Sequence, residues 1–229
     1  MTTRVSTSPF GRALDNAERH RVLRNTYALL ALSMVPTVLG AWVGVTTGIT
    51  AAMGSGLSMI LFLGLAFGFM FAIEKTKNSS TGVFVLLGFT FFMGLMMSRL
   101  IAFVLGYSNG ASLVMTAFGG TAGVFFAMAT LASVVKRDLS GLQQFLFVGV
   151  IVLLVGMVIN MFVASTVGMM VLSMVAIAIF SAFMLVDIKR VMDGGETNYI
   201  SATLAIYLDL INVFQNLLML LGLLGGQRD

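Results

Sequence analysis

The chain has 229 residues, of which 59% are hydrophobic and only 10% are charged. Soluble domains carry about 25% charged residues, so this composition excludes a water-soluble globule. The net charge of +4 comes from basic residues scattered over short polar segments. Nucleic-acid binding needs a basic face with room to dock, so we predict no nucleic-acid partner. The absence of cysteine excludes disulfides and cysteine-based metal or redox sites.

Long apolar runs dominate the sequence and predict transmembrane helices, because about 30 Å of hydrocarbon takes roughly 20 residues at about 1.5 Å per residue. The runs are continuous and do not alternate, which argues against a membrane β-barrel. We therefore predict an all-α, polytopic membrane protein with a polar tail at residues 1–24, expected to be flexible, and a seven-helix transmembrane domain at 25–225. The seven runs are residues 25–47, 52–73, 81–105, 111–135, 141–163, 166–188 and 199–224.

Basic residues in the tail and in alternate connections predict the orientation of the chain. By the positive-inside rule, these segments lie in the cytoplasm, and with seven spans the C-terminus then lies outside. The tail arginines are expected to meet anionic membrane lipid. The residues concerned are Arg4, Arg12, Arg19, Arg21 and Arg24 in the tail, and Lys75, Lys77, Lys136, Arg137, Lys189 and Arg190 in the connections.

Glycines at helical spacing predict close helix packing within three of the runs, because small residues let helices approach in lipid. For the fourth-run stretch "FGGTAG", ligand binding is the alternative interpretation, since glycine exposes the backbone. The glycines are Gly40, Gly44 and Gly48 in the first run, Gly64 and Gly68 in the second, and Gly119 and Gly123 in the fourth.

The last run contains a carboxylate, Asp209, in the segment "IYLDLINVFQNLLMLLG". It lies about ten residues past Tyr199, which is roughly 15 Å along a helix and near the middle of the membrane. An unpaired charge there costs several kcal/mol, so such a residue predicts a functional site. Asn212 and Asn216 follow at i+3 and i+7 on the same helix face. We predict a proton-sensing or ion-pathway site at Asp209, supported by this polar stripe.

Asp187, near the end of the sixth run, is the candidate partner of Asp209. Residue counting leaves it about 10 Å shallower, so contact requires the connection to fold inward or the last helix to start early. Two carboxyl groups that meet would share a proton and titrate as a unit. In the alternative interpretation, Asp187 is an interfacial residue beside Lys189 and Arg190.

The titratable residues do not form a recognisable catalytic or metal-binding set. The one histidine, His20, lies in the polar tail, so no serine inside a span has a histidine base. Intramembrane aspartyl proteases also use two aspartates, but the G-x-G-D setting of those enzymes is absent here. We therefore predict that the protein is not an enzyme, and we assign no cofactor and no metal site.

The C-terminal segment "VDIKRVMDGGETNYISATLAIYLDLINVFQNLLMLLG" resembles the closing signature of the Bax inhibitor-1 (TMBIM) family. In that family an aspartate on the sixth helix and a Y-x-D-x-x-N-x-F motif on the seventh are characteristic. The segments "HRVLRNTYALLALS", "FGGTAGVFF", "VGMVINMF" and "GGETNYI" resemble the bacterial YccA-like branch.

The resemblance implies a seven-helix fold with the last helix central and a bacterial inner-membrane location. It implies modulation of the FtsH protease, since the branch takes its name from such a modulator. The alternative is a pH-sensitive leak of calcium ions, which in the family is attributed to two aspartates matched here by Asp187 and Asp209. The second run departs from the family by having no charge before Glu74, which counts against an arginine-bridged gate and against calcium conduction.

Overall fold

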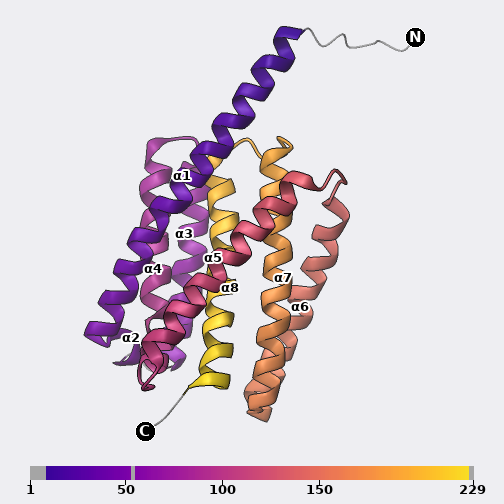
Figure 1. Ribbon diagram of the computed structural model, residues 1–229. Helices are drawn as coiled ribbons and strands as arrows, with labels where there is room; N and C mark the ends of the chain where they lie inside the picture. Colours follow the sequence, from indigo (N-terminus) through magenta and orange to yellow (C-terminus); the bar gives the residue numbers. More distant parts are fainter. Residues whose placement is uncertain (1–8, 53–54, 227–229) are drawn as a thin grey trace.

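The computed structural model describes residues 9–52 and 55–226, with the side chains of 9–16, 55–59 and 140 left outside the description. This part of the chain consists of helices and connections without a strand, which confirms the predicted all-α class. The helices, labelled in Figure 1, are α1 (Pro9–Thr47), α2 (Ile49–Ala52), α3 (Ser55–Thr76), α4 (Ser80–Leu105), α5 (Gly110–Val134), α6 (Ser140–Val163), α7 (Thr166–Met192) and α8 (Tyr199–Gly225).

Six helices in the described ranges are long and apolar enough to cross a membrane. Helical structure satisfies the backbone groups inside each segment, as a hydrocarbon surrounding requires. Residues 55–73 of the predicted run at 52–73 lie on α3, and the role of this run as a seventh span is not confirmed. The six segments are Ala17–Thr47, Ser80–Leu105, Gly110–Val134, Gly141–Val163, Thr166–Met192 and Tyr199–Gly225.

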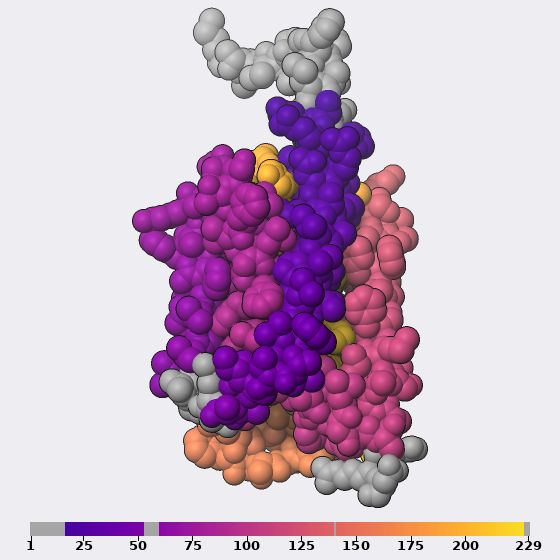
Figure 2. Space-filling view, turned by 90° about the vertical axis from the view of Figure 1, so that its left-hand side faces the viewer, coloured from indigo at the N-terminus to yellow at the C-terminus, as the bar shows by residue number. Residues whose placement is uncertain are grey.

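The first helix begins much earlier than the predicted first span. Residues 9–24, which we expected to belong to a flexible tail, are the first turns of α1. Pro9 stands at the first helical position, which suits its fixed φ angle and its missing N–H group. Residues 1–8 lie outside the described part. Figures 1 and 2 show that this end of α1 projects beyond the other helices.

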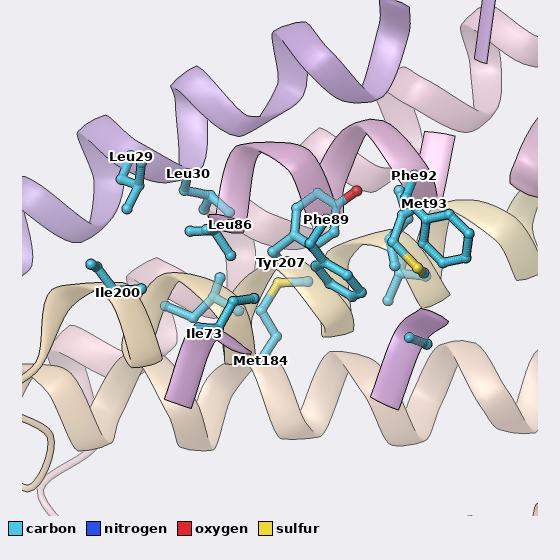
Figure 3. Packing of buried hydrophobic residues seen from close by; sticks show 14 of the residues in the cluster. Leu29, Leu30, Ile73, Leu86, Phe89, Phe92, Met93, Met184, Ile200 and Tyr207 are labelled. Atoms are coloured by element: carbon cyan, nitrogen blue, oxygen red, sulfur yellow. The ribbon is translucent and has the colours of Figure 1, made fainter. Parts of the chain in front are cut away.

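Helix α8 lies among the other helices and contacts α1, α3, α4, α5 and α7. Tyr207 is fully buried on α8, and its hydroxyl shares a hydrogen bond of 2.9 Å with the hydroxyl of Thr37 on α1. The same hydroxyl donates to the backbone oxygen of Thr90 on α4 at 3.4 Å. Figure 3 shows Tyr207 among buried side chains of several helices. These bonds satisfy a phenol group whose burial without a partner would cost several kcal/mol.

The closest helix contact joins α1 to α4. A Cβ atom at Gly40 would overlap with the backbone oxygen of Phe91, and one at Gly94 would overlap with the backbone oxygen of Thr37. Gly44 lies equally close to Ser98, whose hydroxyl is hydrogen-bonded to Thr50 at 2.8 Å. The predicted packing role is therefore confirmed for Gly40 and Gly44.

The other predicted glycine contacts are wrong. Gly48 ends α1 with a φ angle of +64° and has no atom near its potential Cβ position. Gly64 and Gly68 on α3, and Gly119 and Gly123 on α5, likewise have no atom within 4 Å of that position. These glycines face outward because the neighbouring helices pack on other faces of α3 and α5.

We expect Gly94→Val to destabilise the protein and Gly123→Val to be tolerated. The valine at position 94 would meet the α1 backbone, which cannot move without separating the helices, and such overpacking costs about 1–3 kcal/mol. The same change at position 123 points into open space. Thermal unfolding of both variants in detergent measures the difference. Equal melting temperatures would contradict the contact.

Candidate functional site at the aspartate pair

Asp209 is buried on α8, with 6% of its surface exposed. Among the residues whose burial is described, no other charged side chain is buried to this extent. Its neighbours along α8, Tyr207 and Ile211, are also buried, so the carboxyl group sits in the densely packed part of the helix. A carboxylate in such a position needs a partner within the protein or a bound proton.

The structure brings Asp187 to Asp209. Their side chains are in hydrogen-bonding contact between α7 and α8, although residue counting placed Asp187 nearer the membrane surface. An ionised carboxylate only accepts hydrogen bonds, so this contact requires a proton on one of the two groups. The other oxygen of Asp209, Oδ2, has no hydrogen-bond partner among the described residues. We expect such a pair to share one proton and to titrate as a unit.

Asp187 also lies at the edge of a charged region. It is half-buried, and Arg190 and Glu196 are close enough to act on its charge. The Lys189 ammonium donates to Asp193 at 2.6 Å. Asp187 therefore combines both sequence interpretations, because it contacts Asp209 and stands near the polar end of α7.

The asparagines of the predicted polar stripe bond to their own helix. Asn212 donates to the backbone oxygen of Leu208 at 2.8 Å, and Asn216 donates to that of Asn212 at 2.9 Å. Asn216 is buried and Asn212 is half-buried. These hydrogen bonds of the two amides do not reach Asp209, so the asparagines line the same helix without completing the carboxyl contact.

Sequence reasoning missed the residues that fix the turn between α7 and α8. Asn198 caps α8, accepting from the backbone N–H groups of Ile200 and Ser201 at 2.9 and 3.1 Å. Its amide donates to the backbone oxygen of Lys77 and to the side chain of Asn78, both at 2.9 Å. An asparagine before an apolar run is a helix-start signal that would have indicated the cap.

Arg19 of α1 packs against the same turn. Gly194 has a φ angle of +79°, and Arg19 Nε lies 2.7 Å from the point where a Cβ atom of Gly194 would stand. Glycine is required here both by the positive φ and by the close approach of the guanidinium group. The projecting end of α1 is thereby joined to the turn that follows Asp187.

The geometry defines a class: a polytopic helical membrane protein with two carboxyl groups in contact inside its bundle. The residues described include no group of three or more His, Cys, Asp or Glu side chains that could hold a metal ion. A family model described as "Inhibitor of apoptosis-promoting Bax1" matches residues 19–228, and the chain belongs to the Bax inhibitor-1 family.

Relatives of similar length support this assignment. The Escherichia coli K12 protein "Modulator of FtsH protease YccA" is 37% identical over 203 residues, which is 89% of this chain and 90% of the relative. A Vibrio cholerae protein named only as a membrane protein is 35% identical over 209 residues, covering 91% and 92%. The same 37% identity is found with an Escherichia coli O6:H1 protein named "Inner membrane protein YccA".

A charge swap tests the carboxyl contact. Asp187→Lys should be tolerated when Asp209 is present, because the two groups then form an ion pair, and poorly tolerated together with Asp209→Asn. We expect a coupling energy of about 0.5–3 kcal/mol between the two positions. Thermal unfolding of the two single variants and the double variant measures it. Additive effects would show that Asp187 acts only as an interfacial residue.

Proposed function

We propose that the protein is an inner-membrane modulator of the FtsH protease. The observation that carries the proposal is the likeness to a relative named as such a modulator, which spans about nine-tenths of both chains. The likeness covers 203 residues and is not confined to one motif. The positive-inside rule supports an orientation with the N-terminus in the cytoplasm.

The projecting part of α1 offers a surface that a partner protein can contact, and this supports the proposal. In this orientation it extends into the cytoplasm, and its side chains Glu18, His20, Arg21 and Arg24 are exposed. These charges lie outside the buried bundle, so a protein partner can contact them without entering the membrane. The beginning of the chain is also the handle by which a membrane protease would engage this protein.

The contact of Arg19 with Gly194 supports a connection between this surface and the aspartate pair. A partner that moved the projecting turns of α1 would displace the guanidinium group from the α7–α8 turn. Glu196 in that turn acts on the charge of Asp187. Under the proposal, protease binding and the protonation of the pair are therefore linked, and each biases the other by the same free energy.

The proposal predicts that FtsH co-purifies with the tagged protein from Escherichia coli membranes. Deleting Thr2–Asp15 should lengthen the lifetime of the protein in cells with FtsH and leave it unchanged in cells depleted of FtsH. A control variant carries a Gly/Ser linker of equal length in place of these residues, which supplies an unstructured end and should restore degradation. Pulse-chase labelling measures the lifetimes. A lifetime unaffected by the deletion removes the N-terminal segment from the mechanism, and failure to capture FtsH refutes the proposal.

The aspartate pair favours a second candidate function, a proton-sensitive ion leak. The specific observation is the contact of Asp187 with Asp209 together with the unpartnered Oδ2 atom of Asp209. A buried polar atom of this kind is expected to interact with water or an ion at some stage. Calcium as the conducted ion rests only on the family resemblance.

Reconstitution in liposomes tests the leak independently of FtsH. Purified protein in vesicles that contain a calcium-sensitive dye should admit calcium with a rate that changes between about pH 6 and 8, the range chosen to bracket a shared proton. Asp209→Asn should abolish the pH dependence, because one remaining carboxyl group cannot titrate as a pair. Gly123→Val, which leaves the pair intact, is the matched control. A rate equal to that of protein-free vesicles would exclude the leak.

A further inference from the structure

An apolar groove runs between α1 and α5, with α8 at its floor. Its volume is about 630 Å³, and Leu210, Ile211 and Phe214 of α8 form the floor. Figure 2 shows α1 crossing this face of the molecule, with a part of α8 (yellow) visible between α1 and the surface of α5. The groove opens sideways, in the direction in which a membrane protein faces lipid.

Among the described lining side chains, the indole N–H of Trp42 is the one polar group without a hydrogen bond, and a single donor does not hold water in the groove. Its two hydroxyl side chains are already engaged, since Thr37 is bonded to Tyr207 and Thr121 donates to the backbone oxygen of Ala117 at 2.7 Å. A buried water molecule needs two to four polar partners, so water does not fill such a space. Hydrocarbon is the chemistry that matches these walls.

The length of the groove identifies the hydrocarbon. On α1 it runs from Met34 to Val45, which is about 16 Å at 1.5 Å per residue. This equals the depth of one leaflet, about half of a 30 Å hydrocarbon core. A transmembrane helix would need roughly twice that length. The groove lies in the half of the bundle where α1 ends at Thr47 and where α4 turns into α5.

We propose that the groove binds one acyl chain of a phospholipid from the leaflet on the side of the α4–α5 turn. Gly119 forms part of the wall, and no atom lies within 4 Å of its potential Cβ position, so the glycine leaves room for the chain. The bound chain packs against α8 beside Asp209 and fills the space that side chains leave between α1 and α5. It thereby supports the helix that carries the aspartate pair.

The single tryptophan of the protein, Trp42, lines the groove and reports on its occupant. The experiment titrates dibrominated dioleoyl phosphatidylcholine into the purified, delipidated protein in detergent and follows the quenching of Trp42 fluorescence. Detergent dilutes lipid that merely surrounds the protein, so a specific site gives quenching that saturates near one equivalent. We expect this in the wild type.

Two matched variants locate the site. Gly119→Leu fills the groove and should weaken the saturable quenching at least about tenfold, which corresponds to about 1.4 kcal/mol. Gly123→Leu introduces the same side chain one turn further along α5, outside the groove and also in open space, and should behave as the wild type. Ala122→Leu is a second groove-filling variant, and melting curves confirm that each variant is folded.

Three results would overturn the proposal. Quenching that rises without saturation in the wild type and in every variant would mean that Trp42 meets only surrounding lipid. Equal loss in the Gly119→Leu and Gly123→Leu variants would place the lipid outside the groove. A wild-type dimer in light scattering that Gly119→Leu converts to a monomer would identify a second copy of the chain as the occupant. The assay contains no protease, so its result is independent of the proposed function.

Discussion

The burial of α8 is the constraint on which the rest of the structure depends. This helix carries Asp209 into the packed bundle, where the carboxyl group must hold a proton or find a partner. Asp187 supplies the partner from α7, and two carboxyl groups in such contact are expected to share one proton. Tyr207, two residues before Asp209, bonds to α1 and α4 and fixes the rotation of α8. The position of the carboxyl pair therefore follows from polar contacts made on both sides of one helix.

Helix α1 contacts the buried Tyr207 on α8, forms one wall of the apolar groove and packs against the turn after Asp187. Its glycines bring it against α4, so that Thr37 reaches Tyr207 on α8. Its outer wall forms one side of the groove that we assign to an acyl chain. Its projecting end reaches beyond the bundle, and Arg19 links that end to the turn after Asp187. Under the proposed function, Arg19 and this turn are the route by which a change at the projecting end acts on the carboxyl pair.

The two candidate functions place different demands on these features. A modulator of a membrane protease needs an accessible surface and a stable bundle, and it can use the carboxyl pair as a switch. An ion leak needs the pair itself to meet water or an ion, and the unpartnered Oδ2 atom of Asp209 is the observation in its favour. The likeness to a relative named as a modulator of FtsH favours the first.

The sequence by itself determined the helical class, the bounds of most apolar helices and the position of a carboxyl group, Asp209, inside the last apolar helix. These follow from hydrocarbon thickness and from the cost of a charge in lipid, which act on each segment separately. Only the tertiary structure decided which neighbour each segment meets. Gly94 packs on backbone whereas Gly119 and Gly123 lie open, although the spacing of small residues is alike in both helices. The contact of Asp187 with Asp209 likewise could not be predicted by counting residues from the helix ends. The tilt and stagger of neighbouring helices are set by side-chain packing, which leaves no periodic signal in the sequence.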